Sequence, residues 1–106
     1  MSSAAKAFEA LGSIQRQAIV RLLAEGPRSV QEIADGLPIS RPAVSRHLKV
    51  LSEAGLVDDQ PTGNRRLYRL RDEGAEVMRE YLREVWGDVA ARFRMFAENT
   101  ERRPDT

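Results

Sequence analysis

The chain has 106 residues, the size of one small domain, of which 42% are hydrophobic and 31% are charged. It has no cysteine and one histidine, so we expect no disulfide, no metal site and no other cofactor. No apolar run reaches the roughly 20 residues of a membrane span, and no signal-peptide pattern follows Met1. We therefore expect a cytoplasmic protein with no membrane partner.

The net charge of +1 hides an uneven distribution along the chain. Residues 41–71 carry seven basic and three acidic side chains, residues 72–106 carry six and nine, and residues 1–40 carry four of each. A locally basic segment suits contact with phosphates, because counterion release depends on local cations and not on the charge of the whole protein. The alternative is a chance excess of basic residues, and charge alone does not separate the two.

Two helices are predicted in the first quarter of the chain. A short helix over about Ala4 to Leu11 is interrupted by Gly12. Ser13 can cap the next helix, because its hydroxyl can accept a hydrogen bond from a free N–H of the first turn. Apolar residues at helical spacing then continue to the breaker pair Gly26-Pro27.

The next two helices are short and closely spaced. Ser29 and Glu32 match a capping box, which opens a helix over about Val30 to Asp35. After a brief turn, Ser40 can cap a helix from Arg41 to Ala54. Two such helices joined by a tight turn are typical of a helix-turn-helix.

Beyond residue 55 the pattern of apolar residues changes. Short strands over Val57 to Gln60 and Arg65 to Leu70 flank a Pro61-Thr62-Gly63-Asn64 tip, which predicts a hairpin. One long helix follows over about Glu73 to Asn99. The fold class is therefore mainly α with a small β-hairpin, a winged helix-turn-helix in a single domain over residues 1–100. Residues 101–106 form a polar tail that we expect to be disordered.

The helix from Arg41 to Ala54 has two distinct faces. At about 100° per residue, Val44, Leu48 and Leu51 fall together and face the core. The opposite side is small at its start and basic further on, which suits a major groove about 12 Å wide. Arg46 is the candidate for a bidentate contact with guanine. The DNA-binding residues predicted here are Ser40, Arg41, Pro42, Ser45, Arg46, His47 and Lys49. The competing interpretation of this face is an ordinary solvated surface.

His47 is the only histidine and lies at the edge of the predicted core face. In one interpretation it contacts a phosphate, or orients the helix through a hydrogen bond. In the other it is a partly packed, hydrogen-bonded histidine with no role in binding. The sequence leaves both interpretations open.

The tip of the hairpin is basic. Asn64, Arg65 and Arg66 are predicted to contact DNA, because arginines at such a tip can reach a minor groove or the phosphate backbone. The alternative is that the charges protect an edge strand from pairing with another chain. We favour that second role for Arg69 and Arg71.

These residues resemble the ArsR-type family of winged-helix regulators. Ser40 to Leu51 and Glu53 to Val57 look like the family's recognition helix and its exit, while Gly63 to Arg66 and Tyr68 to Leu70 look like its wing. The resemblance covers essentially the whole chain. It implies a dimeric, operator-binding regulator, usually a repressor that is released by a signal.

The resemblance does not extend to the metal sites of the family. Members that sense arsenite carry cysteines where this chain has Ser29 and Gln31, and zinc-type members use a histidine on the last helix, which has none here. The chain therefore resembles the metal-independent branch, for which an unidentified small-molecule effector is a further expected partner.

The long last helix carries more apolar side chains than so small a chain can cover. We expect it to pair with the same helix of a second chain, so that the protein is dimeric through its terminal helices. A twofold dimer would place two recognition helices one DNA turn apart, about 34 Å. The predicted interface is Phe8, Leu11, Leu82, Val85, Trp86, Val89 and Phe93, with Tyr81 and Phe96 extending the stripe. The alternative is a stripe that packs only on its own domain.

The sequence thus predicts a transcription regulator that binds duplex DNA, as a dimeric repressor at a pseudo-palindromic operator. The alternative function is a protein-interaction module that docks a partner through the aromatic stripe and does not touch DNA. An enzyme is not expected, since we find no paired carboxylates in a plausible cleft, no nucleophile with a base and no phosphate loop.

Overall fold

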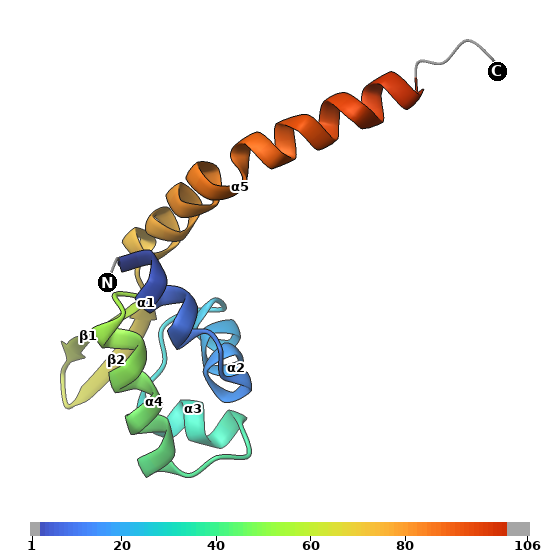
Figure 1. The fold of residues 1–106 in the computed structure, drawn as a ribbon. Coiled ribbons are helices and arrows are strands. Elements are labelled where there is room, and N and C mark those ends of the chain that lie inside the picture. Colours follow the sequence, from blue (N-terminus) through green and yellow to red (C-terminus); the bar gives the residue numbers. More distant parts are fainter. Residues whose placement is uncertain (1–2, 102–106) are drawn as a thin grey trace.

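The computed structural model describes residues 3–101, which form five helices and one antiparallel pair of strands (Figure 1). The order of elements agrees with the winged helix-turn-helix predicted from the sequence. The elements are α1 (Ser3–Ala10), α2 (Ile14–Leu23), α3 (Val30–Gly36), α4 (Arg41–Glu53), β1 (Val57–Thr62), β2 (Arg65–Leu70) and α5 (Asp72–Glu101).

Serine residues begin three of the helices, as predicted. The hydroxyls of Ser13, Ser29 and Ser40 each accept a hydrogen bond from a backbone N–H three residues later, at 3.2, 3.2 and 3.3 Å. At the other end of α4, Gly55 adopts a φ of +79°, which L side chains rarely adopt. This turn lets the N–H of Leu56 donate to the carbonyl of Leu51 at 3.0 Å, which satisfies one of the last carbonyls of the helix.

One apolar core holds the helices and the wing together. Its fully buried side chains come from α2, α3, α4 and β1: Ile19, Ile33, Val44, Leu48, Leu51 and Val57. The predicted core face of α4 is therefore confirmed. Ile14, which continues the apolar spacing of α2 toward its start, is 81% exposed because it lies at the first position of the helix, outside the core.

The wing is a β-hairpin whose register runs from Val57 opposite Leu70 to Thr62 opposite Arg65. Only Gly63 and Asn64 lie between the strands. The sequence placed Pro61 in the tip of the hairpin, but the structure places it in β1, opposite Arg66. β1 pairs only with β2 in the part of the chain that the structure describes, and an edge strand tolerates a residue without an N–H donor. Of the two residues at the hairpin turn, Gly63 has a positive φ of +64° and Asn64 does not.

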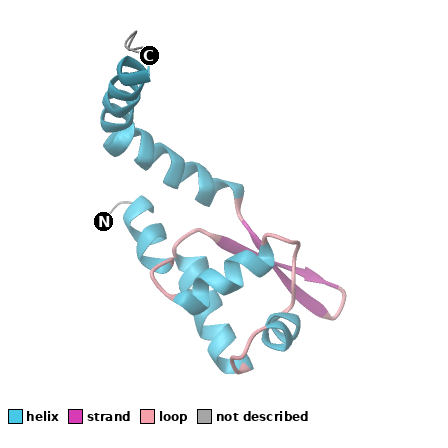
Figure 2. Ribbon diagram, turned by 90° about the vertical axis from the view of Figure 1, so that its right-hand side faces the viewer, coloured by secondary structure: helices cyan, strands magenta, loops and turns pink. Residues whose placement is uncertain are grey.

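A third segment joins the wing from the far side. Arg28, which precedes α3, exchanges two backbone hydrogen bonds with Tyr68, at N–O distances of 3.0 and 2.7 Å. β2 therefore lies between β1 and the segment that enters the helix-turn-helix. This pairing fixes the wing relative to α3 (Figure 2).

α5 begins on the domain and then leaves it (Figure 1). Near its start, Tyr81 packs against Phe8 of α1, with ring centroids 5.3 Å apart. The later part projects away from the body, and the structure is elongated, with extents of 66 × 32 × 23 Å. The helix continues to Glu101, two residues beyond the predicted Asn99. Residues 102–106 of the predicted tail lie outside the described residues.

The start of α5 passes close to the exit from α4, and Gly74 permits this approach. A Cβ atom at Gly74 would lie 2.9 Å from the Cδ2 atom of Leu56 and 3.0 Å from the carbonyl oxygen of Gly55. We expect Gly74→Ala to lower the free energy of unfolding by about 1–3 kcal/mol, because the backbone at Gly55 must shift. Urea unfolding at a fixed protein concentration measures the change.

The matched control for this substitution is Gly87→Ala in the same helix. Apart from its chain neighbours and the nearby backbone of its own helix, no atom of the described residues lies within 4 Å of the added methyl group. This variant should therefore be as stable as the wild type or more stable, by up to about 1 kcal/mol. Equal stability of the two alanine variants would contradict the close packing at Gly74.

Candidate nucleic-acid interface

The helix-turn-helix consists of α3 and α4, joined by residues 37–40. Val44, Leu48 and Leu51 point from α4 into the core, and each is at most 1% exposed. α4 contacts α1, α2, α3 and β1. Because these neighbours surround one side of α4, the opposite side has to face outward.

The outer face of α4 matches the predicted recognition surface. Its residues Arg41, Pro42, Ser45, Arg46 and Lys49 are all exposed. At the helix start, Ser40 is exposed as well, and its hydroxyl oxygen is occupied in capping. The hydroxyl hydrogen remains a donor, and the first N–H groups of the helix add the partial positive charge that attracts anions.

The cations on the outer face of α4 are not neutralised by neighbouring acids. Arg41, Arg46 and Lys49 form no ion pair with any side chain that the structure describes. This distinguishes them from the arginines of the wing and of α5, most of which have acidic partners. The three charges therefore remain available to a ligand of opposite sign.

The wing arginines lie in the predicted place but are paired within the protein. Arg65 forms an ion pair with Glu32 of α3, and Arg66 forms one with Asp59 of β1 at 3.2 Å. Asn64 is exposed at the turn. A phosphate that binds either arginine therefore meets a guanidinium that already contacts a carboxylate.

Arg69 and Arg71 also have acidic partners. Arg69 contacts Asp58 across the strand pair at 2.9 Å, and Arg71 contacts Glu73 at 3.4 Å. The hydrogen bond that Arg69 donates to the carboxylate of Asp58 is the main cause of the raised pKa of Arg69. Both arginines are therefore paired within the protein, and their expected role in protecting an edge strand remains a prediction.

Glu32 has a second contact that its capping role did not reveal. Its carboxylate accepts a hydrogen bond from the backbone N–H of Ser29 at 2.9 Å, as in the predicted capping box. The same carboxylate also forms an ion pair with Arg65. The hydrogen bond from Ser29 is the largest of the effects that lower the pKa of Glu32, and Arg65 and Arg28 lower it further. Glu32 is therefore an anion at neutral pH.

His47 is half-buried and contacts Arg16, a residue of α2 that the sequence did not single out. The Nδ1 atom of His47 lies 3.4 Å from the Nη1 atom of Arg16. Since arginine can only donate, Nδ1 is the acceptor and the ring proton is on Nε2. Arg16 also donates from Nε to the carbonyl of Ala10 at the end of α1. The two contacts connect α4 to α2 and α1.

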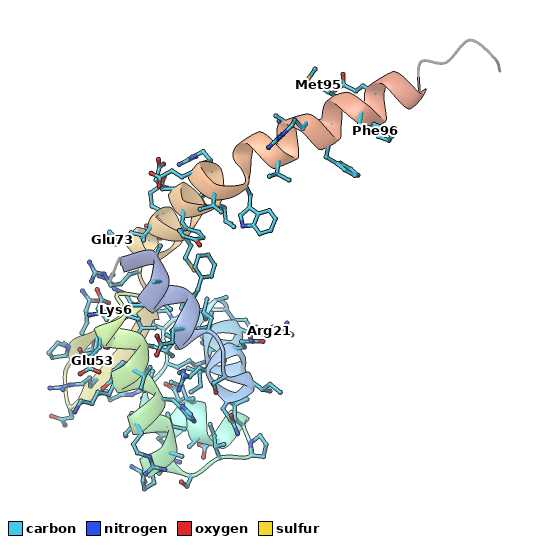
Figure 3. The ribbon with its side chains drawn as sticks, viewed as in Figure 1. Lys6, Arg21, Glu53, Glu73, Met95 and Phe96 are labelled. Carbon is cyan, nitrogen blue, oxygen red and sulfur yellow. The ribbon has the colours of Figure 1, made fainter. Side chains whose placement is uncertain are left out.

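The predicted dimer stripe is exposed along α5. Trp86 is 55% exposed and Phe93 is 72% exposed, and Leu82, Val85 and Val89 lie between 46% and 48%. The interpretation in which the stripe packs on its own domain does not fit these values. Figure 3 shows the neighbouring Met95 and Phe96 on the part of α5 that projects from the body.

The α1 part of the predicted stripe is less exposed than the α5 part. Phe8 is 38% exposed, and Leu11 is half-buried against the core of its own chain. Within this chain, the apolar surface offered to a partner therefore lies mainly on α5.

Among the described residues, no group of three or more His, Cys, Asp or Glu side chains is placed to hold a metal ion. No helix within residues 3–101 combines the length and the hydropathy of a membrane span.

Comparison with known proteins agrees with the winged helix-turn-helix arrangement. The model of the bacterial regulatory protein family arsR matches residues 15–59, from α2 to the first residues of β1. The HTH-type transcriptional regulator Rv2034 of Mycobacterium tuberculosis is 51% identical over 81 residues, which cover 76% of each chain. The HTH-type transcriptional repressor SmtB of the same species is 42% identical over 72 residues, 68% of this chain and 53% of that protein.

A solved structure extends the likeness to nearly the whole chain. It is the solution structure of the homodimeric winged helix-turn-helix DNA-binding domain of Mb0332 from Mycobacterium bovis, a possible ArsR-family regulator. It has a TM-score of 0.65 and 28% identity, and the match covers 98% of this chain and 87% of that one. With its helix-turn-helix, its wing and a regulator 51% identical over three quarters of both chains, this protein belongs to the ArsR family of helix-turn-helix transcriptional regulators.

Proposed function

We propose that the protein is a homodimeric repressor that binds a pseudo-palindromic operator, with α4 in the major groove and the wing against the adjacent backbone or minor groove. The observation that carries the proposal is the outer face of α4, which is exposed and holds three cations that form no ion pair with any described side chain. The proposed contacts are Ser40, Arg41, Pro42, Ser45, Arg46 and Lys49 on α4 and its cap, and Asn64, Arg65 and Arg66 on the wing.

Within this surface we assign different tasks to different residues. Arg46 lies on the outer face, where a guanidinium fork can bond to the O6 and N7 atoms of guanine. The other cations and the hydroxyls of Ser40 and Ser45 suit phosphates, which set the register of the helix on DNA. Pro42 and Ser45 are small, so they leave room for the helix backbone to approach the bases.

Dimerisation is supported by the exposed apolar side chains of α5 and by the homodimeric state of the Mycobacterium bovis domain. An exposed apolar stripe on a helix is typical of an interface. Pairing of α5 with its copy gives a twofold axis, and that axis matches the symmetry of a palindromic operator. Repression is supported by the relative SmtB, which is a repressor.

We also propose a small-molecule effector and a cytoplasmic location, where such a protein meets DNA. A groove of about 560 Å³ between α1 and α4 is in the size range of ligand sites. Charges of both signs line it: Lys6 and Glu53, which Figure 3 labels, and also Arg16. Because Arg16 also contacts His47, a molecule bound to this arginine would act next to α4.

We propose that His47 positions α4 and does not bind phosphate. Its acceptor atom faces Arg16, and burial together with the charges of Arg16 and Arg46 lowers the pKa of its imidazole. The ring is therefore neutral at pH 7, where a phosphate would favour a cation.

The first prediction concerns the base contact. We expect Arg46→Ala to weaken binding to the operator by about 1–3 kcal/mol, roughly 5- to 150-fold, because a bidentate contact is lost. Footprinting across the region upstream of the protein's own gene locates the duplex, and fluorescence anisotropy with that duplex measures the affinity. Wild-type affinity should fall steeply as salt rises.

The control for Arg46→Ala is Arg21→Ala, which removes the same charge from an exposed residue that projects outward from α2 (Figure 3). It should bind almost as well as the wild type. If Arg46→Ala binds as tightly as the wild type, the assignment of α4 is wrong. A wild-type protein that shows no salt-dependent binding to duplex DNA would favour the protein-interaction module instead.

The second prediction concerns the dimer. Sedimentation equilibrium at micromolar concentration should give twice the 11.9 kDa mass of one chain. Trp86→Ala should shift the equilibrium toward monomers, by about 2 kcal/mol or more, since each dimer loses two buried aromatic anchors. The control Val50→Ala removes a partly exposed apolar side chain from α4 and should leave the mass unchanged. A wild-type mass of one chain would count decisively against the dimer.

The third prediction concerns pH. Because the pKa of His47 is lower in the folded state than its ordinary value of 6.5, its contribution to stability is present above pH 6.5 and is lost as the pH falls below it. His47→Asn retains an acceptor for Arg16 but does not titrate. The wild type should therefore lose more stability than this variant between pH 7.5 and pH 5.5 in urea unfolding. Equal losses of stability in the wild type and in His47→Asn would show that His47 has the same pKa in the folded and unfolded states.

A further inference from the structure

The ion pair between Glu32 and Arg65 joins two parts of the proposed DNA-binding surface. Glu32 lies in the first turn of α3, and Arg65 is the first residue of β2, directly after the wing turn. The two residues are 33 positions apart in the sequence. The contact therefore ties the tip of the wing to the first helix of the helix-turn-helix.

The carboxylate of Glu32 is held in place by the start of its own helix. The Oε1 atom that contacts Arg65 also accepts the N–H of Ser29, while the N–H of Glu32 donates to the hydroxyl of Ser29. These capping bonds fix the carboxylate on α3. Arg65 thus meets an anion at a defined position and not a freely moving side chain.

Both partners of this ion pair are open to solvent. The side chain of Arg65 is 56% exposed and that of Glu32 is 45% exposed. Exposed ion pairs are weak and exchange readily, and a phosphate can replace the carboxylate as the partner of arginine. The pair is therefore stable enough to direct Arg65 in the free protein and weak enough to open on DNA.

We propose that Glu32 is a positioning residue that competes with DNA phosphate for Arg65 and so lowers the affinity of the wing. In the free protein it holds Arg65 against α3. On binding, Arg65 transfers to a phosphate and the charge of Glu32 is left without this partner. The inference rests on the proposed contact between Arg65 and DNA.

The same helix provides a matched control. Asp35 has the same charge as Glu32 and also lies on α3, but its carboxylate accepts a hydrogen bond from Gln31 at 2.7 Å and does not contact the wing. Asp35→Asn therefore reproduces the change of net charge without releasing Arg65. Glu32→Gln retains the capping box, because glutamine can serve at this position.

The test measures the affinity of the full chain for a labelled 30-base-pair duplex of mixed sequence, since phosphate contacts do not depend on sequence. We expect Glu32→Gln to bind about two- to fivefold more tightly than the wild type at low salt, the size expected for one exposed ion pair. The logarithm of its affinity should also fall more steeply with the logarithm of the salt concentration, by up to about one unit of slope. Asp35→Asn should change the affinity less.

Arg65→Gln completes a double-mutant cycle. This variant should bind DNA more weakly than the wild type, and Glu32→Gln should have no further effect in its presence. If Arg65→Gln binds normally, the wing contact of the proposed function is wrong, and the competition is wrong with it. If Arg65→Gln binds weakly while Glu32→Gln resembles Asp35→Asn or binds more weakly than the wild type, the wing contact stands and the competition is wrong.

Discussion

The burial of one face of α4 is the constraint on which the recognition surface depends. Val44, Leu48 and Leu51 repeat every three or four residues and lie within the core formed by α2, α3 and β1. Burying each such side chain contributes about 1.5–3 kcal/mol, far more than an exposed ion pair. The core therefore sets the rotation of α4 about its axis, and the position of the outer cations follows from that rotation.

Other contacts of α4 act on the same rotation. The Schellman-type end at Gly55 turns the chain from α4 into β1, so the exit of the helix also determines where the wing begins. The contact between Arg16 and His47 also connects α4 to α2. Because the core and these contacts hold α4 in place, we infer that little ordering of this surface is required on binding DNA.

The two basic regions differ in their electrostatic state. On α4 the outer cations form no ion pair with the side chains that the structure describes, so their charge remains available. On the wing, Arg65 and Arg66 face the acids Glu32 and Asp59, which are neighbours only because the hairpin folds beside α3 and along β1. We infer that α4 supplies most of the attraction at long range, and that the wing joins by exchange of partners.

Sequence by itself determined the features that depend on residues close together in the chain. The capping serines, the two faces of α4, the hairpin at Gly63 and the length of α5 follow from spacings of one to four residues, and the structure confirms them. The family resemblance was also visible in contiguous stretches, above all in residues 40–57.

Only the tertiary structure decided which charges have partners. Arg16 meets His47 across 31 positions, and Glu32 meets Arg65 across 33, and no local pattern encodes either contact. The tertiary structure also decided the place of Pro61. Its sequence context is that of a turn residue, but it lies in β1, which can hold a proline because β1 is at the edge of the sheet. Hydrophobic spacing reports how a helix meets the core, whereas ion pairs between elements depend on how the packed elements are placed, and that placement is a property of the whole fold.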